Sequence, residues 1–76
     1  MNATDFDRIH SEIVNHLTAG GIVQVTTYAR STVYERKHAS YFVAKPDGVY
    51  VRSGKQLNQI VGLVGPLVGI RMGRYV

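Results

Sequence analysis

The stretch Tyr41-Phe-Val-Ala-Lys-Pro-Asp-Gly-Val-Tyr-Val-Arg52 decides the fold, because two apolar runs flank the triplet Pro46-Asp47-Gly48. Proline presets φ for a turn, aspartate can bond its own backbone, and glycine accepts positive φ. Alternate residues of each run are apolar, as half-buried strands require. The stretch therefore predicts an antiparallel hairpin with strands over residues 40–45 and 48–53.

The segment before this hairpin predicts a helix over residues 4–19 and strands over 22–28 and 32–35. The run Thr4-Asp5-Phe6-Asp7 resembles a capping box and would start the helix at Thr4. Apolar residues at three- and four-residue steps form its stripe: Phe6, Ile9, Ile13, Val14 and Leu17. Gly20-Gly21 would end it, since glycine tolerates the left-handed cap conformation. Residues 35–38 are polar and predict a loop or an exposed strand end.

After the hairpin, Ser53-Gly54 breaks the strand, and residues 55–60 predict one short helical turn capped by Ser53. Residues 67–72 predict a last strand. A helix followed by mostly neighbouring strands favours an α+β fold. We therefore expect a single domain over residues 1–76, with one N-terminal helix packed on a three- to four-stranded antiparallel sheet.

The chain has 76 residues and a net charge of +4, which is unevenly distributed. Residues 1–18 hold three acids and Arg8, whereas the remainder holds eight Lys or Arg against Glu35 and Asp47. A basic sheet region favours an acidic partner, such as a phosphate backbone or an acidic protein face, although a basic surface can also serve solubility alone.

The chain has no cysteine, so neither disulfides nor thiolate metal sites can brace it. The N-terminus carries acids where a signal peptide needs basic residues, and the apolar run 60–70 is shorter than the roughly 20 residues of a membrane span. We expect a cytoplasmic protein. The same run predicts core beneath the helix or, alternatively, an exposed patch used in a homodimer.

A repeated Tyr-x-Arg pattern is the strongest sign of a binding surface. Residues two apart in a strand share a face, so each repeat can present a ring beside a guanidinium. Tyrosine and arginine are enriched where binding energy concentrates, and they also suit single-stranded nucleic acid. The alternative is structural, with rings and Arg stems covering the sheet. The predicted partner-binding residues are Tyr28, Arg30, Tyr34, Arg36, Tyr50, Arg52, Arg71 and Arg74.

The sequence contains no motif that is typical of a catalytic site. Ser53-Gly54-Lys55 has a fragment of phosphate-loop character but lacks the upstream glycine and the following Ser or Thr. No serine lies in a nucleophile-elbow motif. His10 and His16 have no third ligand at useful spacing, which favours an edge position over metal binding. We therefore expect no enzymatic activity, no cofactor and no metal.

Four segments together resemble a set of short, uncharacterised bacteriophage-encoded accessory proteins. The segments are Val25–Tyr34, the pairs Lys37-His38 and Tyr41-Phe42 taken together, Val49–Lys55 and Ile70–Tyr75, within residues 22–76. The resemblance implies a phage or mobile-element origin and transfers no catalytic residue. Proteins of this kind commonly bind and block host machinery, and inhibitors of CRISPR–Cas effectors (anti-CRISPR proteins) are one class of them.

The expected function is thus non-enzymatic binding that inhibits a host protein or ribonucleoprotein complex in the bacterial cytoplasm. A small basic nucleic-acid-binding module is the alternative, and steep salt dependence would distinguish it. A third reading is a phage structural or assembly component, which would form large homo-oligomers.

Overall fold

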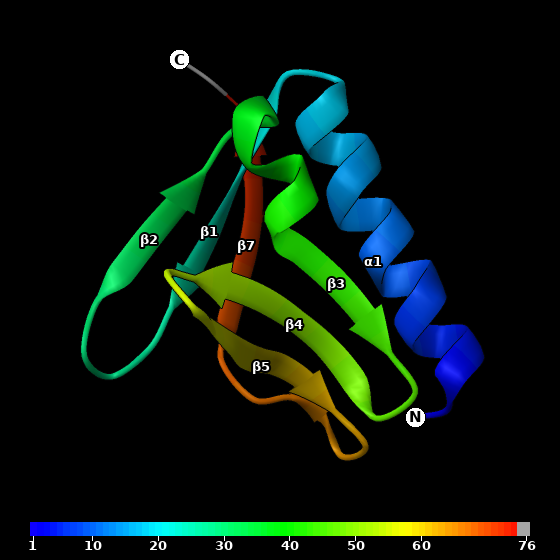
Figure 1. Cartoon of the computed structure of the whole chain (residues 1–76). Helices are drawn as coiled ribbons and strands as arrows, with labels where there is room; N and C mark the ends of the chain where they lie inside the picture. Colours follow the sequence, from blue (N-terminus) through cyan, green and yellow to red (C-terminus); the bar gives the residue numbers. More distant parts are fainter. Residues whose placement is uncertain (75–76) are drawn as a thin grey trace.

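The computed structural model describes residues 1–74 and shows one long helix beside two antiparallel sheets (Figure 1). Sheet A has the strand order β2-β1-β7, and sheet B has the order β3-β4-β5-β6. The α+β class with an N-terminal helix is confirmed, and the strands divide between these two sheets. The elements are α1 (Ala3–Thr18), β1 (Gly21–Thr26), β2 (Ser31–Tyr34), the 3₁₀ helix η1 (Arg36–Tyr41), β3 (Phe42–Lys45), β4 (Gly48–Ser53), β5 (Gln56–Gly62), β6 (Gly65–Pro66) and β7 (Gly69–Arg74).

Helix α1 begins at Ala3, one residue before the predicted start at Thr4. Asn2 is the cap, because its side chain accepts from the Asp5 backbone N–H while the Asp5 carboxylate accepts from the Asn2 N–H. The helix thus starts with a capping box, as predicted, but Asn2 and Asp5 form the box and Thr4 does not. At the other end Gly20 adopts φ 95°, so the predicted glycine stop is confirmed.

The region after the central hairpin differs most from the prediction. Residues 55–60 do not form a helical turn; they belong to β5, which pairs antiparallel with β4. Gly54, at φ 60°, makes the tight turn that joins the two strands. Of the polar residues 35–38, Glu35 is the N-cap of η1 and the other three belong to it in place of a loop. The strand expected from residue 40 therefore begins at Phe42.

The central hairpin is present, but Gly48 is required for a different reason from the predicted positive φ. Its φ is not positive; instead, a Cβ at Gly48 would collide with the backbone oxygen of Val61 on β5. The strand therefore needs glycine for the close approach of β5, next to the register shift between Val49 and Tyr50.

The hydrophobic core lies where α1 and the inner faces of both sheets meet. Helix α1 contributes Phe6, Ile13 and Leu17, with Ile9 partly buried against them, and strand β3 lies beside the helix (Figure 1). The apolar run 60–70 divides: Ile60 and Val61 are buried, whereas Leu63 and Val64 are exposed. The buried core residues are Phe6, Ile13, Leu17, Val23, Val25, Tyr34, Phe42, Val49, Val51, Ile60 and Val61.

Two histidines at the edges of the helical stripe fasten α1 to both sheets. His10 Nε2 lies 2.8 Å from the carbonyl oxygen of Phe42 in sheet B. His16 Nε2 lies 2.6 Å from the carbonyl oxygen of Gly73 in sheet A. Helix α1 thus bridges two sheets that share no strand. Within residues 1–74, no helix has the length and apolar character needed to cross a membrane.

Candidate functional site: a polar cleft between the two sheets

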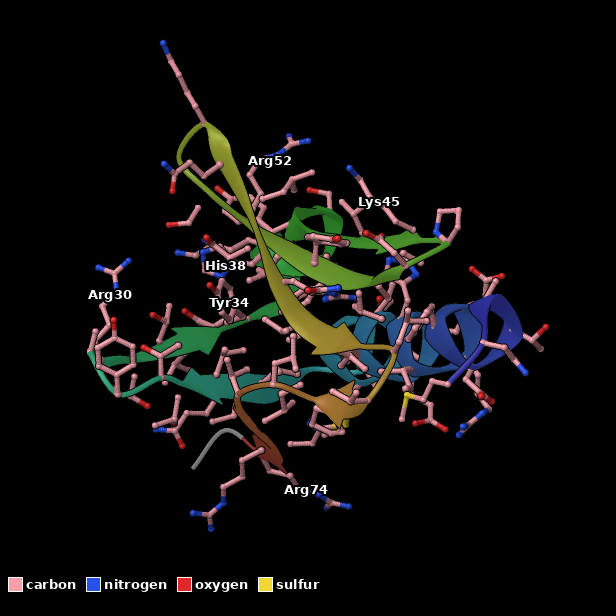
Figure 2. The ribbon with its side chains drawn as sticks, turned by 90° about the horizontal axis from the view of Figure 1, so that it is seen from below. Arg30, Tyr34, His38, Lys45, Arg52 and Arg74 are labelled. Carbon is pink, nitrogen blue, oxygen red and sulfur yellow. The ribbon has the colours of Figure 1, made fainter. Side chains whose placement is uncertain are left out.

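The eight predicted binding residues do not form one surface. Arg52, Arg30 and Arg74 point toward three different sides of the molecule (Figure 2). Tyr50 and Arg52 do emerge together, on the face of β4 opposite the buried Val49 and Val51. The hypothesis of a shared Tyr–Arg face therefore holds for one repeat within a strand.

Tyr50 also has partners inside its own hairpin. Its hydroxyl donates to Asp47 at 2.8 Å, and Lys45 Nζ lies 5.2 Å from its ring centroid. The bond to Asp47 is the main cause that raises the pKa of the Tyr50 hydroxyl above its ordinary value. Tyr50 therefore has a structural role within its own hairpin, through Asp47 and Lys45.

The other repeats are divided by the fold. Tyr34 is only 8% exposed and belongs to the core, so its ring cannot supply external contact area, whereas Arg36 is exposed on η1. Tyr28 and Arg30 lie in the turn after β1, because the strand predicted to reach residue 28 ends at Thr26. Arg71 and Arg74 lie three residues apart on β7 and therefore on opposite faces of sheet A.

A cleft of about 260 Å³ opens between the sheets at the end away from the start of α1. Arg30 lies at the turn that borders it, and Tyr34 lies deeper, beside His38 (Figure 2). Among residues 1–74, Arg30 is the one charged residue that lines this cleft. Its lining residues are Val25, Thr27, Arg30, Thr32, Tyr34, Val51, Ser53, Asn58, Gln59, Ile60 and Val68.

Strand register explains why this end is polar. Thr32 pairs with the buried Val25 in sheet A, and Asn58 pairs with the buried Val51 in sheet B. Directly opposed residues share a face, so Thr32 and Asn58 point into the space between the sheets. Thr32 and Asn58 thus occupy inward positions where alternation predicts apolar residues. The space between the sheets therefore ends in an open, polar cleft.

The turn that carries Arg30 is fixed by Thr27. The Thr27 hydroxyl accepts from the backbone N–H groups of Ala29 and Arg30, each at 3.3 Å, and the Thr27 N–H donates to the Arg30 carbonyl at 2.8 Å. Such side-chain-to-backbone bonds stabilise a turn. They hold the backbone of Arg30 at the border of the cleft while its side chain stays exposed.

Tyr34 places a hydroxyl at the cleft while its ring packs into the core. The ring makes edge contacts with Phe42 and His38, at centroid distances of 5.1 and 5.7 Å. His38 is itself held by the Glu35 backbone N–H, which donates to its Nδ1 at 3.0 Å. Burial raises the pKa of the Tyr34 hydroxyl, and the nearby charge of Arg30 partly offsets that rise.

The Tyr34 hydroxyl forms no hydrogen bond with any of residues 1–74, and no fully buried side-chain oxygen in that range lacks a partner. The hydroxyl therefore reaches open space, and the cleft that it lines supplies that space. It remains available as a donor to a ligand.

The cleft lining has the chemistry to bind an anionic group. Arg30, Tyr34 and Asn58 supply a guanidinium, a hydroxyl and an amide, all of which donate to a carboxylate or phosphate oxygen. Residues 1–74 contain no cluster of three or more His, Asp or Glu side chains that could hold a metal ion.

Sequence reasoning selected Arg30 and Tyr34 but missed Thr32, Ser53 and Asn58. Asn58 could have been found only if β5 had been recognised as a strand. The segment Gln56–Gln59 lacks the apolar alternation that would have indicated one. Comparison of the chain with protein-family models, with curated proteins and with solved structures finds no match.

Proposed function

We propose that this protein is a non-enzymatic binding protein, of the kind phages use to inhibit a host complex, and that it engages an acidic segment of its target at the cleft between its sheets. The observation that carries the proposal is the cleft lining: inward-facing polar residues and one arginine, without a carboxylate. A CRISPR–Cas effector is one class of complex that such an inhibitor would block.

The chemistry of the lining supports an acidic side chain as the bound group. A volume of about 260 Å³ is below the roughly 300–1,000 Å³ typical of small-molecule pockets. It suits one side chain better than a cofactor. A carboxylate there would form charge-assisted bonds with Arg30 and would be partly removed from water, which strengthens each bond.

The test compares two charge reversals, Arg30→Glu at the cleft and Arg36→Glu on η1. Tagged protein is used to capture its target from nuclease-treated host lysate, and binding to the identified complex is then titrated. Arg30→Glu is expected to weaken binding at least about tenfold, because removing one partner of a desolvated charge pair costs about 2–5 kcal/mol. Arg36→Glu should bind normally. Equal loss in both variants would refute the role of the cleft.

A small nucleic-acid-binding module is the second candidate, and one observation favours it. Tyr28 is fully exposed (106%) two residues from Arg30, so its ring is free to stack on an unpaired base. Capture that disappears after nuclease treatment, with affinity falling steeply as salt rises, would favour this function over the inhibitor.

A further inference from the structure

The exposed edge of β7 is a second surface that the cleft does not use. β7 is the longer of the two edge strands of sheet A, with six residues against four in β2. Its residues are exposed or only half-buried, and Met72 is 42% exposed. An uncovered edge strand is a template for pairing with another chain.

Ladder geometry identifies which backbone groups point outward. The Thr27 N–H donates to the Arg30 carbonyl, which makes this a hydrogen-bonded pair of the β1–β2 ladder. Bonded and non-bonded pairs alternate along an antiparallel ladder. Val23 and Val25 therefore turn their backbone groups toward β2, and the residues between and beyond them turn toward β7.

The same alternation continues across β1 into β7. Arg71 and Gly69 pair with Gln24 and Thr26, so their backbone groups point back to β1. The backbone groups of Ile70 and Met72 consequently point away from sheet A. The outer edge of β3 differs, because there His10 covers the Phe42 carbonyl. Within residues 1–74, no strand pairs with the outer edge of β7.

Two hollows lie near the ends of the β1–β7 ladder. One of about 540 Å³ lies beside Gly69 and is lined by Tyr28, Leu67 and Val68 among others. The other, of about 480 Å³, lies beside Arg74 and is lined by His16 and Gly20 among others. The occupant of the edge itself is an extended chain, because only an extended backbone can pair with the outward groups of Ile70 and Met72.

Charge selects the chemistry of that chain. Both ion pairs in residues 1–74 belong to Arg8 on α1, so Arg71 and Arg74 have no carboxylate partner there. A second copy of this protein would place like charges of two β7 strands close together, in a chain that already carries +4. An acidic segment would instead neutralise them.

We propose that the edge of β7 accepts an extended acidic segment of a partner protein as an added strand. The segment pairs with the backbone of Ile70 and Met72, sets apolar residues against their side chains, and sets a carboxylate against Arg71. This surface is independent of the cleft and does not need Arg30.

The probe is a labelled seven-residue peptide of alternating valine and glutamate, with a valine–lysine peptide as control, and binding is followed by fluorescence anisotropy. Met72→Pro removes an outward N–H without removing a ladder donor to β1 and is expected to weaken binding at least tenfold. Met72→Val keeps the N–H and should bind as the parent does. Arg71→Glu should lose binding, whereas Arg30→Glu should retain it, which separates this edge from the cleft.

Amide exchange on the unaltered protein guards against misfolding of the proline variant. The N–H groups of Ile70 and Met72 should exchange more slowly when the valine–glutamate peptide is bound. Absence of peptide binding, or binding without slower exchange at these two positions, would overturn the proposal. So would light scattering that shows a dimer which Met72→Pro converts to monomer, because a second copy would then occupy the edge.

Discussion

Inward-facing residues of paired strands line both ends of the space between the sheets, but the two ends have opposite chemistry. Under α1 the inward residues are apolar, as with Val49 and Val61, which are 0% and 1% exposed. At the far end the inward residues include Thr32 and Asn58, and the space opens as the cleft. The difference teaches that strand alternation sets only the direction of a side chain; the layer that covers it decides whether the position becomes core or binding site.

The covered end should give the largest response to mutation. Phe6 on α1 is fully buried in the core, and Phe6→Ala is expected to cost about 3–5 kcal/mol of unfolding free energy through lost burial and a residual cavity. That is comparable with the whole stability expected for a domain of this size, roughly 4–11 kcal/mol. Urea unfolding followed by circular dichroism measures the change.

Ile13→Val is a smaller truncation at the same end, because Ile13 is also fully buried and loses only one methylene group. It should cost about 0.5–1.5 kcal/mol and keep the fold. Leu63→Ala, at a side chain that is 63% exposed, should change stability by less than about 0.5 kcal/mol. A Phe6→Ala protein as stable as Leu63→Ala would show that the covered end is not the core.

The open end should show the reverse pattern, with little effect on stability. The Asn58 side chain forms no hydrogen bond with residues 1–74, and its strand pairs with β4 through the backbone. Asn58→Val should leave the unfolding free energy within about 0.5 kcal/mol, because valine suits a strand and no internal bond is lost. It should weaken capture of the target, because the cleft loses an amide donor. A loss above 2 kcal/mol in the urea midpoint analysis would place Asn58 in the structural core instead.

The contrast between the two ends also explains which features could be predicted from the sequence. The stripe of α1 and the β3–β4 hairpin combine local turn or cap chemistry with apolar periodicity, and both are present. β5 was missed because Gln56–Gln59 has neither an apolar alternation nor a strong strand propensity. It is a strand because β4 offers it a ladder across the Gly54 turn, and that is tertiary information.

The eight predicted binding residues are dispersed for the same reason. Two residues share a face only while the chain stays extended, and η1 begins between Tyr34 and Arg36. Tyr34 thereby enters the core, whereas its hydroxyl reaches the cleft. Local deviations from an alternating pattern are expected where function competes with packing, and the inward Thr32 and Asn58 are such deviations.

Tyr34 belongs to both ends, because its ring packs in the core and it also lines the cleft. The change in stability on its titration is the smallest effect that we expect. Burial raises its pKa above the ordinary value of 10.0, so the folded protein holds this proton more tightly than the unfolded chain does. The resulting stabilisation is complete below pH 10 and is lost as pH rises through the folded pKa. Tyr34→Phe removes the titrating group and should flatten that loss in alkaline unfolding curves.

The pKa of the Tyr50 hydroxyl is also raised, mainly because this hydroxyl donates a hydrogen bond to Asp47. The comparison is therefore made in a Tyr50→Phe background. Between pH 9 and 11, the unfolding free energy of the double variant Tyr34→Phe/Tyr50→Phe should fall less with rising pH than that of the single variant Tyr50→Phe. The proposed acidic ligand would accept a hydrogen bond from the Tyr34 hydroxyl, which should make the difference between the two pH slopes larger. Identical pH slopes with and without Tyr34 would mean that its hydroxyl is as solvated as in the unfolded chain, and the cleft would then be an open surface.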